Sequence, residues 1–117
     1  MIKLLSDIVA EAKEGERCLT IEESMKLVRA CDNPLLLDVR EPAEHSLDNV
    51  EGFINIPRGV LEMKLPGLCD DPDRCILIHC ATGGRAALSA NALRYMGYKN
   101  VHLISATFED IKKNFHF

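Results

Sequence analysis

The sequence has no tryptophan, an aromatic content of only 5 %, no long apolar run and no excess of positive charge. Its apolar runs, such as Pro34–Leu37 and Cys75–Ile78, are far shorter than the roughly 20 residues that cross a membrane, so no membrane span is expected. Acidic residues outnumber basic ones by 18 to 14, and no basic cluster stands out. A nucleic-acid partner is therefore not expected.

The composition is that of a globular chain. Hydrophobic residues make up 47 % and charged residues 27 % of its 117 residues, which suits one domain with its own core. The first residues contain no apolar signal core, and five cysteines are an odd number, so at least one thiol should be free. Both features favour a reducing compartment, the cytoplasm. The sequence does not indicate an oligomeric state.

Two helices are expected near the N-terminus. Ile2, Leu5, Val9 and Ala12 form one helical stripe, which we expect to face the core and to end at Gly15. The stretch Thr20–Glu23 has the form of a capping box and predicts a second helix, which runs to about Cys31.

Strands and helices alternate in the rest of the chain. Leu35–Val39 and Cys75–His79 are apolar on both faces, which is typical of central strands in a parallel sheet. Further strands are expected at Phe53–Ile56 and Val101–Ile104, and helices from Pro42, over Val60–Leu65 (closed by Pro66–Gly67), over Arg85–Met96 and over Phe108–Phe115. This alternation predicts an α/β fold whose ligands bind beyond the carboxyl ends of the strands, near Asp38–Arg40 and His79–Cys80.

The segment Cys80–Arg85 lies between a buried strand and a helix. A cysteine followed there by small residues and two glycines can be surrounded by backbone N–H groups as the chain turns into the helix. The start of the helix and Arg85 add positive charge. We expect a loop at a sheet edge to be only shallowly buried, so these groups favour the thiolate and predict Cys80 as a nucleophile. The plainer interpretation of a lone cysteine is a small core residue.

Four segments, in order, resemble the rhodanese (thiosulfate sulfurtransferase) domain family: Leu36–Glu44, Gly52–Gly59, Cys80–Arg85 and Ala87–Tyr98. The resemblance implies a rhodanese-like three-layer α/β fold, with a mainly parallel central sheet and helices on both faces. It covers residues 18–117 and leaves residues 1–17 as an N-terminal helical extension. Ala106–Thr107 stands where a Gly-Gly pair is common in the family, which leaves the donor preference open.

The resemblance implies a role for each residue of the loop. Cys80 would be the sulfur-accepting nucleophile, and the backbone of Ala81, Thr82, Gly83, Gly84 and Arg85 would hold the persulfide and the incoming anion. Asp38 and Arg40 would form a buried pair that supports the loop. Sulfur would pass from a small anionic donor such as thiosulfate to cyanide in an assay, and to a thiol or a protein in the cell. No metal or organic cofactor is implied.

Other functions remain open beside sulfur transfer. A rhodanese-like module can bind a partner without catalysis or sense oxidants through Cys80. A phosphatase or arsenate reductase is disfavoured by loop length, because phosphatases of this fold place five residues between cysteine and arginine, whereas four separate Cys80 from Arg85. The smaller ring suits a single sulfur atom better than a phosphate.

Several other side chains have two interpretations. Arg58 is either a cation that attracts the donor or a solvated surface residue. His79 is interpreted as a strand-end residue rather than a base. Cys69, in a polar stretch, is a candidate resolving thiol, whereas Cys75 is expected to pack in the core. The spacing of Cys69, Cys75, His79 and Cys80 does not fit a zinc site.

Overall fold

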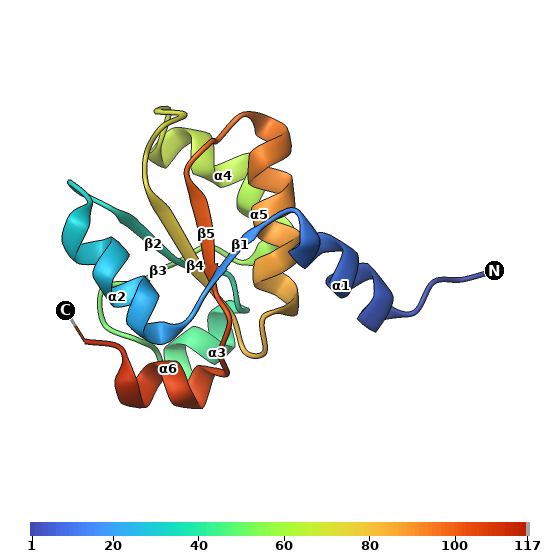
Figure 1. Cartoon of the computed structure of the whole chain (residues 1–117), viewed down its shortest axis with the longest axis horizontal. Coiled ribbons are helices and arrows are strands. Elements are labelled where there is room, and N and C mark those ends of the chain that lie inside the picture. Colours follow the sequence, from blue (N-terminus) through green and yellow to red (C-terminus); the bar gives the residue numbers. More distant parts are fainter. Residues whose placement is uncertain (117) are drawn as a thin grey trace.

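Within the part of the chain that the structure describes, five parallel strands form one sheet in the order β1-β5-β4-β2-β3 (Figure 1). The computed structural model describes residues 1–116. The strands are β1 (Arg17–Leu19), β2 (Leu35–Asp38), β3 (Ile54–Asn55), β4 (Ile76–His79) and β5 (Val101–Ile104). The expected α/β class with a parallel central sheet is confirmed.

Helices connect the strands. They are α1 (Leu5–Glu14), α2 (Ile21–Ala30), α3 (Pro42–Leu47), a 3-10 turn (Arg58–Val60), α4 (Leu61–Leu68), α5 (Gly84–Met96) and α6 (Phe108–Asn114). The predicted capping box is present at the start of α2, where Thr20 accepts from the Glu23 N–H and the Glu23 side chain accepts from the Thr20 N–H. Gly97, in a left-handed conformation, ends α5 as expected.

The central strands bury both faces, because successive side chains point to opposite sides. Leu35 and Leu37 pack in one apolar cluster and Leu36 packs in the other. The first cluster includes residues of α1, α4 and α5, and the second includes residues of α2 and α6. Helices therefore cover both faces of the sheet, which gives the three layers that the sequence predicts.

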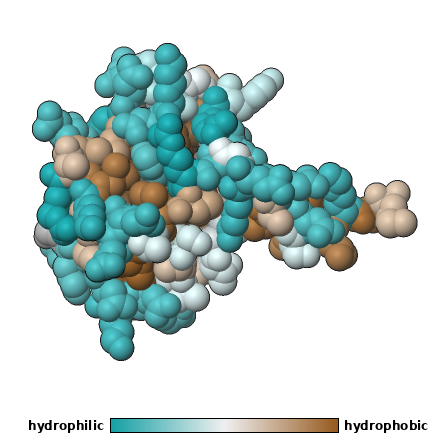
Figure 2. Space-filling model, in the orientation of Figure 1, coloured by the Kyte–Doolittle hydropathy of each residue, from teal (hydrophilic) through white to brown (hydrophobic). Residues whose placement is uncertain are grey.

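The apolar stripe of helix α1 is less buried than expected. Only Ala12 of the stripe is buried, whereas Ile2 and Leu5 are 92 % and 69 % exposed. The reason is that α1 contacts the domain through its C-terminal part, beside α5, while its N-terminal part projects away (Figure 1). Apolar residues consequently gather on the projecting arm in the space-filling view of Figure 2.

Two further local expectations need correction. The sequence contains no strong signal for β1, a short strand that pairs with β5. Helix α4 does not stop at Pro66 but continues to Leu68, because buried Leu65 accepts a hydrogen bond from the Cys69 N–H at 2.8 Å. No helix in the described part of the chain is long and apolar enough to cross a membrane.

Candidate active site

The candidate site lies at the carboxyl ends of β2 and β4. These strands are neighbours, and their register places Asp38 directly opposite His79. The Val39 N–H continues the ladder by donating to the His79 carbonyl at 3.1 Å. Cys80 follows His79 and Arg40 follows Val39, so this register brings the predicted nucleophile and the predicted supporting pair to one edge of the sheet.

The Cys80 thiol is held by backbone amides. Its Sγ accepts hydrogen bonds from the N–H groups of Gly83 at 3.0 Å and Ala86 at 3.3 Å. Gly83 has a φ of 98°, a left-handed conformation that favours glycine and turns the chain into α5. These donors and the N-terminal end of α5 stabilise a negative charge on the sulfur. Ala86 lies one residue beyond the loop that the sequence singled out.

The burial of Cys80 differs from the expectation. The residue is only 2 % exposed and belongs to the apolar cluster that includes Val39 and Ala86. Thr82 is exposed, and Ala81 is half-buried. The thiol therefore lies beneath the loop, because the chain curls back over it to bring the amides of Gly83 and Ala86 into contact with the sulfur. Thr82 is the most exposed residue of the loop.

Arg85 forms an ion pair that sequence reasoning did not assign. Its guanidinium donates to the two carboxylate oxygens of Glu44 at 2.6 and 3.0 Å. Hydrogen bonding to Arg85 lowers the pKa of Glu44 to about 2, and the same contact raises the pKa of Arg85. Arg85 thus ties α3 to the start of α5, with much of its charge balanced by Glu44. Glu44 lies within the motif, but its sequence position contains no signal of this contact.

Asp38 and Arg40 form a buried pair. Arg40 Nε and Nη2 donate to the Asp38 carboxylate at 3.0 and 2.8 Å, and Arg40 Nη2 also donates to the Asp48 carbonyl. His45 Nδ1 lies 2.8 Å from Asp38 Oδ2. Burial alone would raise the pKa of Asp38, but the hydrogen bonds from Arg40 and His45 hold it below its ordinary value.

The Asp38–Arg40 pair is connected to the loop that holds Cys80 through Phe108. The Arg40 guanidinium lies 4.0 Å from the centre of the Phe108 ring, and the Phe108 N–H donates to the Ala81 carbonyl at 2.9 Å. On the other side, the Asn55 side chain donates to the carbonyls of Asp38 and Arg40, both at 2.9 Å. Sequence reasoning assigned no role to Phe108. It missed the contacts of Asn55 and His45 because they depend on how β3 and α3 pack beside the end of β2, which no local pattern shows.

His79 and Arg58 take no part in holding the thiol. His79 is fully buried, and its ring packs edge-on against Phe53 with centroids 4.6 Å apart. Burial lowers the pKa of His79, which suits a neutral core side chain. Arg58 Nη1 donates to Glu62 at 2.7 Å, so this predicted cation is also paired with a carboxylate.

Two of the other cysteines, Cys69 and Cys75, are buried. Cys69, the candidate resolving thiol in a polar stretch, is buried, and its Sγ donates to the Asp71 carbonyl at 3.6 Å. Cys75 is buried as expected. Within residues 1–116, no group of three or more His, Cys, Asp or Glu side chains could hold a metal ion.

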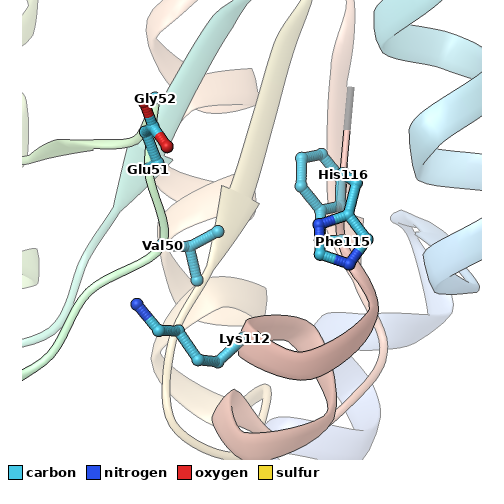
Figure 3. Close-up of a pocket in the computed structure, with 6 residues that line it drawn as sticks. All are labelled: Val50, Glu51, Gly52, Lys112, Phe115 and His116. Carbon is cyan, nitrogen blue, oxygen red and sulfur yellow. The ribbon is translucent and has the colours of Figure 1, made fainter.

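A surface cleft of about 450 Å³ lies elsewhere, between α6 and the loop that precedes β3 (Figure 3). It is lined by Val50, Glu51, Gly52, Lys112, Phe115 and His116. None of the residues predicted from the sequence for sulfur transfer lines this cleft, so the candidate site is defined by the loop around Cys80.

The chain is similar to known proteins of one domain family. The family model for the rhodanese-like domain matches residues 20–114. Thiosulfate sulfurtransferase PspE from Escherichia coli is 28 % identical over 65 residues, which cover 56 % of this chain and 62 % of PspE. The chain spans less than half the length of the other curated relatives that it matches.

Solved structures share the fold. The polysulfide-sulfur transferase homodimer of Wolinella succinogenes has a TM-score of 0.74 and 28 % identity, over 92 % of this chain and 80 % of that one. A Rhodopseudomonas palustris protein of unknown function, described as a possible tyrosine phosphatase, has a TM-score of 0.83 over 97 % of this chain and 92 % of its own. At 24 % identity, the latter likeness concerns the fold alone.

Proposed function

The chain belongs to the rhodanese-like domain family, and on this basis we propose that it is a sulfurtransferase that carries sulfur as a persulfide on Cys80. The observation that carries the proposal is the pair of N–H groups, from Gly83 and Ala86, that point at Cys80 Sγ. These donors stabilise a thiolate before the reaction and a persulfide anion after it. The roles of Asp38, Arg40 and Arg85 are to position this loop.

The proposed reaction has two steps. The Cys80 thiolate attacks the outer sulfur of thiosulfate, a new S–S bond forms, and sulfite leaves with the electron pair of the old S–S bond. A nucleophile then attacks the outer sulfur of the Cys80 persulfide and releases the thiolate. The nucleophile is cyanide in an assay, which gives thiocyanate, and a thiol or a protein thiolate in the cell. A reducing compartment such as the cytoplasm would keep Cys80 available for this cycle.

The size of the loop supports sulfur transfer over phosphate transfer. Four residues separate Cys80 from Arg85, and the Arg85 guanidinium is turned toward Glu44. Phosphate sites offer several donors to the phosphate oxygens, and a guanidinium is common among them. The contacts around Cys80 Sγ instead suit a single added sulfur atom.

Mass spectrometry of the intact protein tests the proposal. After incubation with thiosulfate, the wild type should gain one sulfur atom, which cyanide then removes as thiocyanate. Cys80→Ser should gain none, whereas Cys18→Ser, which removes the exposed thiol, should load like the wild type. Folded wild type that gains no sulfur, or a Cys80→Ser variant that forms thiocyanate at the wild-type rate, would overturn the proposal. Hydrolysis of an aryl phosphate without sulfur transfer would favour a phosphatase. Oxidation of Cys80 in a protein that takes up no sulfur would favour a redox-sensing module.

A further inference from the structure

Lys13, near the end of α1, lies against the loop that holds Cys80. A Cβ atom placed on Gly83 would be 3.4 Å from Lys13 Nζ, and one on Gly84 would be 3.4 Å from Cγ2 of Val9. Gly83 is the residue whose N–H donates to Cys80 Sγ at 3.0 Å. The ammonium group therefore lies beside the amide that contacts the reactive sulfur.

The backbone on either side of Lys13 is anchored to α5. Ala12 is 5 % exposed and belongs to the same apolar cluster as Cys80. The Asn91 side chain donates to the Ala12 carbonyl at 3.1 Å, and the Arg94 guanidinium donates to the Gly15 carbonyl. Figure 1 shows the end of α1 beside α5, in agreement with these contacts. Lys13 is thus held at the loop by the packing of the N-terminal segment.

Among the residues that the structure describes, Lys13 differs from the other cations at this edge in that its charge is not paired with a carboxylate. Arg40, Arg58 and Arg85 each donate to a carboxylate, at 2.8, 2.7 and 2.6 Å. Within residues 1–116, no carboxylate or other hydrogen-bond acceptor pairs with the Lys13 ammonium, which is half-buried. A cation with no ion pair, beside a thiol-holding loop in a chain with a net charge of −4, is suited to attract an anion.

We propose that Lys13 binds the anionic group of the sulfur donor at the active loop, and so gives the protein a preference for negatively charged donors over neutral ones. This inference rests on the proposed sulfurtransferase function. When thiosulfate reacts, its sulfonate end becomes sulfite and takes the electron pair of the broken S–S bond. An ammonium beside the loop attracts the donor before the reaction and stabilises the leaving anion during it.

The test compares two donors in thiocyanate formation from cyanide: thiosulfate, and an uncharged organic trisulfide whose uncatalysed rate is subtracted. For Lys13→Gln, KM for thiosulfate should rise roughly threefold to tenfold, and KM for the trisulfide should stay unchanged. Lys13→Arg should retain the wild-type KM. The matched control is Lys3→Gln, which removes the same charge from the same segment, where Lys3 is already paired with Glu11. Added salt should raise KM for thiosulfate in the wild type more than in Lys13→Gln.

The other possible outcomes would overturn the inference, and one of them would also overturn the proposed function. An unchanged KM for thiosulfate in Lys13→Gln overturns the inference and leaves the sulfurtransferase function standing. Equal losses with both donors also overturn it, because they would show that Lys13 only supports the loop. A wild type that forms no thiocyanate from either donor overturns the proposed function and this inference together. Circular dichroism and urea unfolding of each variant show that the differences arise in folded protein.

Discussion

The Glu44 carboxylate and the Arg85 guanidinium form two hydrogen bonds, of 2.6 and 3.0 Å, across 41 residues of sequence. This contact joins α3 to the first turn of α5 and so connects the segment after β2 to the loop that holds Cys80. Because Glu44 balances the charge of Arg85, the contact supports the positioning role proposed for this arginine. Four measurements would test this site and its surroundings.

Replacing Glu44 by Gln should reveal a pH-dependent contribution to stability. Since the pKa of Glu44 falls from 4.5 to about 2 in the folded protein, its contribution is complete above pH 4.5 and is lost as the pH falls toward 2. Both side chains are about one-third exposed, so we expect a loss of only about 0.5–1 kcal/mol near neutral pH. Urea unfolding at several pH values measures it. Glu51→Gln, an exposed control, should show no such trend, and a constant difference down to pH 2 would contradict the prediction.

Replacing Gly83 by Ala should weaken both stability and sulfur loading. A non-glycine residue at φ 98° costs about 1–2 kcal/mol, and the added Cβ would contact Lys13. The shifted backbone would also turn the Gly83 N–H away from Cys80. Gly67→Ala in α4 is the control, because nothing lies within 4 Å of its Cβ position and alanine favours a helix. Equal urea midpoints for Gly83→Ala and Gly67→Ala would show that a side chain at residue 83 causes no strain, and would contradict the prediction.

Asp38→Asn should be strongly destabilising. Asp38 is fully buried and accepts from both Arg40 and His45, so its neutralisation leaves a buried guanidinium without its counter-ion. Breaking one side of such a pair costs about 3–5 kcal/mol, which urea unfolding would measure. Asp48→Asn provides the comparison, because its partner Lys112 is exposed and the expected loss is below about 1 kcal/mol. Similar losses of unfolding free energy in Asp38→Asn and Asp48→Asn would contradict the prediction that the buried charge of Asp38 stabilises the fold.

The thiols should differ in their alkylation by iodoacetamide near pH 7.5. Burial, together with hydrogen bonding to Cys31, raises the pKa of Cys75 to about 12, so almost none of its thiolate is present. Cys18 is exposed and should be modified faster than Cys75, although partial burial raises the pKa of the Cys18 thiol above its ordinary value. Peptide mass spectrometry follows each site, and unfolding in urea should remove the protection of Cys75. Modification of Cys75 as fast as Cys18 in folded protein would contradict the burial of Cys75, which directly precedes β4.

The helices and strands follow largely from local patterns. The capping box at Thr20–Glu23, the helix stop at Gly97 and the apolar stretch Ile76–Ile78 depend only on neighbouring residues. Each is found where the sequence pattern predicts it. The parallel sheet follows from the alternation of such elements. Since parallel strands end at one edge, the alternation by itself places Asp38 and Cys80 at the same edge of the sheet. The strand order, in which β2 lies beside β4, brings them close together.

Contacts between distant segments do not follow from local patterns. The pairing of Arg85 with Glu44, the contact of His45 with Asp38 and the position of Lys13 beside Gly83 depend on how whole helices pack on the sheet. The burial of Cys80 is of the same kind, because the turn of the loop and the packing of α5 together cover the sulfur. Local hydrogen bonding and apolar periodicity act over a few residues, whereas partners, burial and charge balance arise only when the elements pack together.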